Sequence, residues 1–348
     1  MGGTVVVTGG CGFIGSHFVR LLRERTEYRI VNLDKLTYAG DTERVCEVRA
    51  DGRYRFVRRD IADRAALDEL FRAERPWAVV NFAAESHVDR SILDASPFLR
   101  TNVVGVQALL ETGRRYAVRR FVQVSTDEVY GDLEGAGRAS EGNPLRPSSP
   151  YAASKAAADL LCLAYARTYG LSVLITRGSN TYGPWQFPEK LIPVMIRRAL
   201  AGDSLPLYGD GMQRRDWLYV TDHCEAILSA LDRGEDGAVY NIATETERTN
   251  VEVAEALLRA LVEEAIVTPG LSQIRHTPDR PGHDRRYAMT VDKIRHGLGW
   301  SPRVRFEEGL VQTVRWYLGR RDWLERAASG SYRRYHEAVY ARDWGRRG

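Results

Sequence analysis

The chain has 348 residues, enough for one large α/β unit or two domains with a substantial core. Its 50 basic side chains nearly balance its 46 acidic ones, and no block of like charge occurs, so no nucleic-acid partner is expected. Four scattered cysteines lack C-x-x-C spacing and predict neither a disulfide framework nor a zinc site, and a reducing, cytoplasmic location is the simplest interpretation. No metal is expected. No signal peptide, membrane-spanning run or myristoylation signal is expected, and so no membrane partner.

The first elements predict a dinucleotide-binding turn. A β-branched run at residues 4–8 leads into the glycine-rich residues 9–15 and then into an amphipathic helix. Glycines at this spacing allow a tight turn and the close approach of a pyrophosphate to the helix N-terminus, although an ordinary strand-to-helix turn is the alternative. A second strand, residues 30–33, ends in Asp34, where a carboxylate would bind the ribose 2′-hydroxyl. A carboxylate there repels a 2′-phosphate, so NAD is favoured over NADP.

Two more strands are expected at residues 55–57 and 78–82. Asp60, beyond the first of these, either contacts the adenine or serves as a helix cap or turn residue. Small residues follow the second strand and would let the chain pass close to a cofactor. His87 alone is more typical of a packed or surface histidine than of a catalytic one, and Asn102 could be plain helix surface.

The chemistry is expected after the fifth strand, residues 121–124, because active sites of open α/β sheets lie at the carboxyl ends of strands. Tyr151 and Lys155 are spaced i, i+4 in an Ala-rich segment and therefore share a helix face. A cation beside a tyrosine favours the phenolate, which can take a proton from an alcohol while a hydride leaves to a nicotinamide. The adjacent carboxylates of Asp127 and Glu128 exceed what an alcohol dehydrogenase needs. They indicate a second acid–base step on the same substrate.

A sixth strand at residues 172–176 completes a doubly wound parallel Rossmann sheet, so the predicted fold class is α/β with a smaller C-terminal α/β substrate domain. Paired arginines at 214 and 215 beside an aromatic suit a diphosphate with a stackable base, or form a solvated turn. The charged loop at residues 279–287 is either solvated or closes on an anionic ligand. The expected domains are residues 1–177 and about 216–244 for NAD, about 178–215 and 245–330 for the substrate, and a tail at 331–348 without assigned function.

Helix starts are expected at two places in this second half. Residues 221–222 are predicted to cap one helix, and Thr249 with Asn250 is predicted to start another. A last amphipathic helix is predicted over residues 306–318.

Several motifs together resemble a known family. The glycine-rich residues 9–15, with Tyr151 and Lys155, resemble the extended short-chain dehydrogenase/reductases. Within these, the chain resembles the dTDP-glucose 4,6-dehydratases from about residue 4 to about residue 317, and the specific element is the triplet at residues 126–128. Epimerases of the superfamily lack its carboxylate pair, and GDP-mannose dehydratases carry Ser in place of its Asp. The segments that carry the closer resemblance are residues 85–91, 125–131 and 279–284.

The resemblance implies an NAD-dependent hydro-lyase that converts dTDP-glucose to dTDP-4-keto-6-deoxyglucose. Tyr151 would be the base at the C4 hydroxyl, with Lys155 lowering its pKa and binding the nicotinamide ribose. Thr126 would hydrogen-bond the C4 oxygen. Glu128 would remove the C5 proton and Asp127 would protonate the departing C6 hydroxyl, before hydride returns to C6.

The resemblance also implies the binding residues and a homodimer formed through long helices over residues 98–116 and 151–169. The cofactor residues would be Gly9, Gly12, Phe13, Ile14, Gly15, Asp34, Lys35, Leu36, Thr37, Asp60, Ile61, Phe82, Ala83, Ala84, Ser86, Thr101, Tyr151, Lys155 and Thr181. The substrate residues would be Ser86, Thr126, Asn180, Lys190, Leu191, Pro206, Tyr208, Arg215, Asn250, Arg280, His283 and Tyr287.

Three residues depart from the family pattern. Cys11 stands where Ala is usual, Gly178 where Cys is usual, and Thr181 where Asn is usual. Cys11 is small enough to leave the glycine turn intact, whereas Thr181 could weaken one cofactor contact. Two other functions stay open: an NAD-dependent UDP-sugar 4-epimerase, and a non-catalytic dinucleotide-sensing module. The presence of the complete catalytic set weighs against the second.

Overall fold

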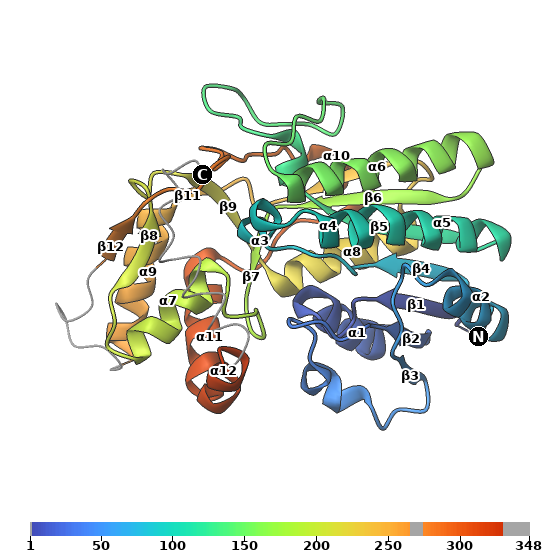
Figure 1. Cartoon of the computed structure of the whole chain (residues 1–348), viewed down its shortest axis with the longest axis horizontal. Coiled ribbons are helices and arrows are strands. Elements are labelled where there is room, and N and C mark those ends of the chain that lie inside the picture. The colour runs from blue at the N-terminus through green and yellow to red at the C-terminus, as the bar shows by residue number, and fades with distance from the viewer. Residues whose placement is uncertain (1, 265–273, 330–348) are drawn as a thin grey trace.

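The computed structural model describes residues 2–264 and 274–329. A sheet of seven parallel strands lies at its centre (Figure 1). The strands are β1 (Thr4–Thr8), β2 (Arg29–Leu33), β3 (Tyr54–Val57), β4 (Ala78–Asn81), β5 (Arg120–Thr126), β6 (Val173–Gly178) and β10 (Val239–Ile242). Their order is β10-β6-β5-β4-β1-β2-β3. From β1 the chain adds β2 and β3 on one side, and then β4, β5, β6 and β10 on the other side. This is the doubly wound arrangement that was predicted.

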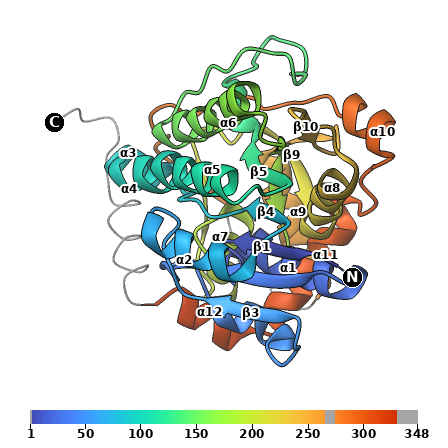
Figure 2. The ribbon, with the colours of Figure 1, turned by 90° about the vertical axis from the view of Figure 1, so that its right-hand side faces the viewer.

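Helices cover both faces of this sheet (Figure 2). One face carries α1 (Phe13–Arg25), α8 (Val220–Arg233) and α10 (Asp292–Leu298), and the other carries α2 (Arg64–Glu74), α5 (Val106–Arg115) and α6 (Pro150–Tyr169). Alternate residues of β1 enter the two cores, because successive side chains of a strand point to opposite faces. Val5 and Val7 pack with the first group of helices, and Val6 packs with the second.

A smaller α/β domain lies beside the carboxyl ends of the large sheet's strands (Figure 1). Its strands are β7 (Asn180–Tyr182), β9 (Arg214–Tyr219) and β11 (Glu247–Thr249) in one sheet, and β8 (Leu205–Tyr208) with β12 (Ile274–Thr277) in another. Its helices are α7 (Leu191–Leu200), α9 (Asn250–Glu263), α11 (Phe306–Leu318) and α12 (Arg321–Ala327). Their apolar faces meet in a third hydrophobic core, which is separate from the two cores of the large sheet.

The predicted helix starts had different outcomes. The α9 start is confirmed, because Thr249 and Glu252 form a capping box. The predicted cap of α8 at residues 221–222 is wrong: that helix begins one residue earlier, at Val220, and has no side-chain cap. The Asp222 carboxylate instead accepts the backbone N–H groups of Arg303 and Val304, each at 2.8 Å. It therefore ties α8 to the segment that precedes α11.

Among the described residues of the C-terminal part, two helices were not predicted, α10 and α12. The helix expected over residues 306–318 is present as α11, but it is not the last, because α12 follows it. Most of the expected tail, residues 331–348, lies outside the described residues. No helix within residues 2–264 and 274–329 has the length and apolar character needed to cross a lipid bilayer.

Candidate active site

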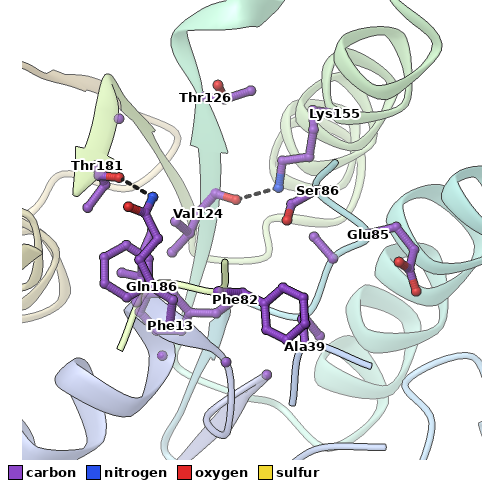
Figure 3. A pocket seen from close by; sticks show the side chains of 18 of the residues that line it. Phe13, Ala39, Phe82, Glu85, Ser86, Val124, Thr126, Lys155, Thr181 and Gln186 are labelled. Carbon is purple, nitrogen blue, oxygen red and sulfur yellow. Dashed lines mark hydrogen bonds between the residues drawn. The ribbon is translucent and has the colours of Figure 1, made fainter. Parts of the chain in front are cut away.

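A cavity of about 340 Å³ lies where strands β1, β4, β5 and β6 end and the smaller domain begins (Figure 3). It brings together most of the residues predicted from the sequence. Those that line it are Gly9, Gly12, Phe13, Ile14, Gly15, Asp34, Lys35, Thr37, Ile61, Phe82, Ala83, Ala84, Ser86, Thr101, Thr126, Asp127, Glu128, Tyr151, Lys155, Asn180, Thr181, Lys190 and Leu191. The predicted residues outside its lining are Leu36, Asp60, Pro206, Tyr208, Arg215, Asn250, Arg280, His283 and Tyr287.

The glycine turn is built so that backbone, and not side chains, borders the cavity. Gly9 has a φ of +68°, and a Cβ atom on it would lie 2.6 Å from the backbone nitrogen of Ala83. A Cβ atom on Gly15 would collide with the carbonyl oxygen of Gly9. Helix α1 then begins at Phe13 without a side-chain cap and without an acidic residue in its first turn. Such an end leaves N–H groups available to an anion, which fits the pyrophosphate of a dinucleotide.

Asp34 closes the next part of the cavity wall. Its carboxylate oxygens accept the N–H groups of Cys11 at 3.0 Å and of Leu36 at 2.8 Å. These two bonds fix the carboxylate at the end of β2, the position that a ribose hydroxyl would reach. The pKa of Asp34 is raised by burial, and the two backbone bonds oppose that rise.

Asp60 acts as a turn residue, one of its two predicted alternatives. Its Oδ1 accepts the N–H of Ala62 at 2.9 Å. Its other oxygen lies 3.7 Å from Nζ of Lys35, which in turn donates to Thr101 Oγ1 at 3.1 Å. Lys35 and Thr101 line the cavity and Asp60 does not, so Asp60 bears on the cavity through its ion pair with Lys35.

The two adjacent carboxylates stand in different electrostatic surroundings. Asp127 is 3% exposed, and burial together with the charge of Glu128 raises its pKa to about 8. Burial also raises the pKa of Glu128, but the nearby cations of Arg280, Lys190 and Arg215 oppose that rise. At neutral pH, Asp127 therefore retains its proton, whereas Glu128 has the stronger support for ionisation.

Tyr151 and Lys155 lie on one face of α6, as predicted, but their electrostatics differ from the expectation. Lys155 Nζ donates to the carbonyl oxygen of Val124 at 2.6 Å, and burial lowers its pKa to about 8 (Figure 3). The pKa of Tyr151 is raised by burial and by the charges of Glu128 and Asp127. The predicted lowering by Lys155 is not found in this structure: the ammonium donates to a backbone carbonyl oxygen of β5, and the charges that act on the phenol are those of acids.

Asn102 is a structural residue of the site that the sequence analysis missed. It is 1% exposed and lies in a π-helical segment, Leu99–Gly105, within the long helix predicted over residues 98–116. Its side chain accepts the N–H of Glu85 at 2.9 Å and donates to the carbonyl oxygen of Glu85 and to Ser154 Oγ. It therefore joins the loop after β4 to α6, and its interpretation as helix surface is wrong. The available signal was an asparagine followed directly by the apolar residues Val103 and Val104.

Other cavity residues also escaped prediction. Gln186, Glu189 and His223 line the cavity, and each has a buried side chain. Tyr38 donates its hydroxyl to Glu189 at 3.1 Å. His87 is buried near Glu189, which agrees with the packed alternative stated for it. No local motif marks Gln186 or His223 as a site residue, because each reaches the cavity only through the tertiary fold.

The predicted substrate residues form a second group next to Glu128. The Arg280 guanidinium pairs with Asp89 at 2.5 Å, and the Tyr208 hydroxyl donates to the same carboxylate at 3.0 Å. Burial opposes ionisation of Asp89, but the charges of Arg280 and His87, together with the hydrogen bonds from Arg280 and Tyr208, outweigh it and lower the pKa of Asp89 to about 2. The Arg280 charge also acts on Glu128, which places this group at the substrate side of the carboxylate pair.

Arg215 and Tyr287 provide a second cationic surface in this group. The Arg215 guanidinium lies 4.1 Å from the centre of the Tyr287 ring and donates to the carbonyl oxygen of Asp284 at 2.7 Å. Arg215 is only 4% exposed, so the solvated-turn interpretation of the paired arginines is wrong for it. His283 pairs with Asp279 at 2.6 Å, and Asn250 and Pro206 lie at the start of α9 and in β8.

The described residues contain no group of three or more His, Cys, Asp or Glu side chains placed to bind a metal ion. The cavity fits NAD in three places. The uncapped start of α1 suits the pyrophosphate, the Asp34 carboxylate suits the adenosine ribose, and the Tyr151–Lys155 pair suits the nicotinamide part.

Comparisons with known proteins agree with this geometry. The family model described as GDP-mannose 4,6 dehydratase matches residues 6–313. A dTDP-glucose 4,6-dehydratase of Xanthomonas campestris pv. campestris is 49% identical, over 95% of this chain and 97% of its own length. The crystal structure of a dTDP-glucose 4,6-dehydratase from Streptomyces venezuelae, with NAD and dTDP bound, is 47% identical with a TM-score of 0.88, over 93% of this chain and 99% of that one.

A more distant structure is the UDP-glucose 4-epimerase of Thermotoga maritima, solved with UDP-glucose. It is 30% identical with a TM-score of 0.84, over 91% of this chain and 99% of that one. The epimerase shares the fold but is less similar in sequence than the dehydratases. This chain belongs to the GDP-mannose 4,6 dehydratase family and, within it, to the dTDP-glucose 4,6-dehydratases.

Proposed function

We propose that this chain converts dTDP-glucose to dTDP-4-keto-6-deoxyglucose in one cavity, through C4 oxidation, loss of water across C5 and C6, and reduction at C6. The observation that carries the proposal is the placement of Asp127 and Glu128 in the same cavity as Tyr151 and Lys155. Oxidation and reduction at C4 need only the phenol and the lysine. Two further carboxyl groups with different protonation supply the acid and the base that removal of water requires.

NAD fits the cofactor half of the cavity. When bound, it accepts a hydride from C4 of the sugar and returns it to C6. The N–H groups at Phe13 and Ile14 would bind its pyrophosphate, Asp34 the adenosine ribose, and Lys155 the nicotinamide ribose. The remaining cofactor residues would border it through van der Waals contact and backbone groups.

The proton transfers are assigned to side chains that line the cavity. Tyr151 takes the proton of the C4 hydroxyl as a phenolate; burial and the charges of Glu128 and Asp127 raise its pKa, so this form would depend on the positive charge of the bound oxidised nicotinamide. Thr126 orients the C4 oxygen with its hydroxyl. The ketone at C4 acidifies the C5 hydrogen, which Glu128 removes as a base. Asp127, which retains its proton below a pKa of about 8, donates to the departing C6 hydroxyl, and one water leaves. The proton held by Glu128 then returns to C5 as C6 is reduced. The proton that Tyr151 took from the C4 hydroxyl balances the one that Asp127 gave to the departing hydroxyl, so the conversion to ketone and water has no net proton change.

The substrate half suits a nucleoside diphosphate. Arg215 and Arg280 provide two cations for the diphosphate, and Lys190 adds a third near the sugar. Asn250, His283 and Tyr287 would contribute polar and stacking contacts to the nucleotide. In support of this assignment, all of these side chains lie in the smaller domain, opposite the glycine turn.

A homodimer is part of the proposal. Of the exposed large hydrophobic side chains among the described residues, most lie on the helices expected to form the interface. Leu99 and Val104 are 54% and 49% exposed, and Leu160 and Tyr169 of α6 are 59% and 54% exposed. Neighbouring apolar side chains on adjacent helices favour burial against a second copy. Size-exclusion chromatography with light scattering would test this arrangement.

A cytoplasmic location is also proposed. The four cysteines, at positions 11, 46, 162 and 224, are all free thiols. Free thiols are typical of a reducing compartment. Fractionation of the source cells, with an antibody to the chain, would test this location.

The direct test incubates the purified protein with dTDP-glucose and follows the sugar nucleotide by mass spectrometry. A dehydratase yields a product lighter by one water, which also develops colour in alkali because it is a 4-keto-6-deoxy sugar. UDP-glucose serves as the parallel substrate, since a 4-epimerase would convert it to UDP-galactose without any change of mass. Epimerisation without loss of water would refute the proposal, and binding of NAD without turnover of either sugar would favour the dinucleotide-sensing alternative.

A further inference from the structure

Two residues of the cavity wall, Gly178 and Thr181, are connected by His223. Gly178 ends β6 and pairs in register with Thr126 of β5. Thr181 lies in β7, and His223 reaches the same place from α8 with only 2% of its surface exposed. All three line the cavity. Gly178 and Thr181 therefore both lie against His223.

Gly178 makes room for the His223 ring. A Cβ atom built on Gly178 would lie 2.5 Å from Cε1 and 2.6 Å from Nε2 of His223. These separations are shorter than real Cβ contacts, so the imidazole occupies the volume that the usual cysteine side chain would need. The observed position of His223 thus depends on glycine at residue 178.

His223 in turn determines what the Thr181 hydroxyl can offer a ligand. Nδ1 of His223 lies 2.8 Å from Thr181 Oγ1, and Thr181 Oγ1 lies 3.2 Å from the carbonyl oxygen of Ser179. The hydroxyl has a single proton, which goes either to Nδ1 or to the Ser179 carbonyl, according to the tautomer of the ring. In both cases the proton is used within the protein. Toward the cavity, Thr181 Oγ1 is therefore a hydrogen-bond acceptor only.

The imidazole is a neutral partner in this arrangement. Burial lowers the pKa of His223 to about 4, so the ring carries no charge near neutral pH. The Thr181 hydroxyl and the Gly178 backbone both lie against the ring, and no ion pair with it is found among the described residues. A neutral pair is compatible with the positive charge of an oxidised nicotinamide nearby.

We propose that the Thr181 oxygen accepts a hydrogen bond from the amino group of the nicotinamide carboxamide, and that His223 is the positioning residue that orients it. The inference rests on the proposed NAD-dependent function and deepens it. Asp34 marks the adenosine end of the cavity, and Thr181 lies across from Lys155 at the other end (Figure 3). The carboxamide is the donor group that NAD carries at that end. An asparagine presents its own rigid amide there, whereas a threonine hydroxyl needs a second residue to orient it.

The test compares two dinucleotides that differ at this group. The acetylpyridine analogue of NAD+ has a methyl ketone in place of the carboxamide and so lacks the N–H donor. The purified protein is incubated with equal amounts of both, and the bound dinucleotides are quantified by mass spectrometry. We expect the unaltered chain to favour NAD+ by about tenfold, the size of one hydrogen bond in a buried site. His223→Phe, which keeps a ring but removes Nδ1, should reduce this preference to less than about threefold.

Three further variants complete the test. Thr181→Val removes the hydroxyl, and Gly178→Ala displaces the ring by the Cβ contact, so both should lose the preference as His223→Phe does. His296→Phe alters an exposed histidine of α10 and should retain it. ADP-ribose, which lacks the nicotinamide, reports whether each variant still has an intact adenosine site. Binding of ADP-ribose with an unchanged tenfold preference in His223→Phe or Thr181→Val would overturn the inference.

The outcome is separable from that of the proposed function. Turnover of dTDP-glucose by the unaltered chain is measured in parallel. A failed dehydratase assay with a clear preference for NAD+ would overturn the proposed reaction and leave the carboxamide contact standing. A successful dehydratase assay without any preference for NAD+ in the unaltered chain would support the proposed reaction and overturn the carboxamide contact.

Discussion

The two halves of the proposed site are built in different ways: the cofactor half lies within the cavity, and the substrate half is the group around Arg215 and Arg280, next to the cavity and outside its lining. The cofactor half is made of backbone: a glycine turn, the uncapped start of α1, and strand ends whose side chains are small. The substrate half is made of charged and aromatic side chains that pair with partners far away in sequence, such as Arg280 with Asp89 and Arg215 with the Asp284 carbonyl. The carboxylates of residues 127 and 128 lie between the two.

This difference explains why the halves respond to different forces. A backbone site is insensitive to the charge state of the protein but intolerant of added atoms. A site of buried ion pairs tolerates small changes of shape, but loss of one partner leaves the other charge buried without compensation. Substitutions should therefore separate cofactor binding from substrate binding, and the following predictions test that separation.

The largest effect is expected from Glu128→Gln. An amide at this position cannot remove the C5 proton, so kcat for the 4-keto-6-deoxy product should fall by about 10²–10⁴. Oxidation at C4 should persist, because Tyr151 and Lys155 are unchanged, and reduced cofactor should accumulate on mixing with dTDP-glucose. Stopped-flow absorbance of the reduced nicotinamide measures this directly. Glu255→Gln, an exposed position on α9, is the control and should behave as the unaltered chain.

If no reduced cofactor accumulates in Glu128→Gln, the carboxylate is needed before the oxidation at C4. The assignment of oxidation to Tyr151 and of C5 proton removal to Glu128 would then be wrong. The NAD content of Glu128→Gln should equal that of the unaltered chain. A lower content would show that the two halves of the proposed site are not independent.

Arg280→Ala should break the substrate half alone. It removes a cation from the diphosphate site and leaves the Asp89 carboxylate buried without its partner, for a loss of about 2–5 kcal/mol in substrate binding. The corresponding rise in KM for dTDP-glucose is about 30-fold or more, while the NAD content stays the same. Arg275→Ala, an exposed arginine of β12, is the matched control. An equal effect of both variants on KM would argue for bulk charge and against a specific site.

Gly15→Ala should break the cofactor half alone. The added Cβ atom collides with the Gly9 carbonyl oxygen, so the turn must shift and NAD binding should weaken by about tenfold or more. The affinity for dTDP should be unchanged. Gly142→Ala, where a Cβ atom meets nothing within 4 Å, controls for the substitution itself. Calorimetric titration with each ligand tests the pair, and parallel loss of dTDP affinity would contradict the separation.

The smallest effect is a pH dependence of turnover. The pKa of Asp127 is raised to about 8, so its acid form predominates below that pH and is lost as the pH rises. Turnover should therefore be flat from neutral pH to about 8 and then fall about tenfold per pH unit. Lys155, with a pKa lowered to about 8, would steepen the fall by losing its charge in the same range. A rate that rises steadily through pH 9 would contradict the assignment of Asp127 as the acid.

The sequence predicted the local patterns of the cofactor half but not its tertiary contacts, for a physical reason. The glycine turn, Asp34 and the spacing of Tyr151 and Lys155 are local patterns, and local spacing determines which groups share a turn or a helix face. Asn102 was predicted to lie on a helix surface, but it is buried and links Glu85 to Ser154. These three residues belong to segments that only the fold brings together.

The pKa of Tyr151 and the connection between Gly178 and Thr181 could not be predicted from the sequence either. The raised pKa of Tyr151 reflects burial and two neighbouring acids, which spacing along α6 cannot reveal. Gly178 and Thr181 were visible as unusual residues, but their connection through His223 required the packing of α8 against the strand ends. The sequence therefore revealed the chemistry of the motifs, but not the distant residues that each motif contacts in the fold.

One isotope measurement tests the central claim, that a hydride leaves C4, water is expelled by the carboxylate pair, and the same hydride returns at C6. dTDP-glucose carrying deuterium at C4 is converted in ordinary water, and the product is analysed by nuclear magnetic resonance. The account predicts deuterium at C6 of the 4-keto-6-deoxy product, together with one solvent hydrogen at C5. Deuterium that remains at C4, or that is lost to the solvent, would contradict it.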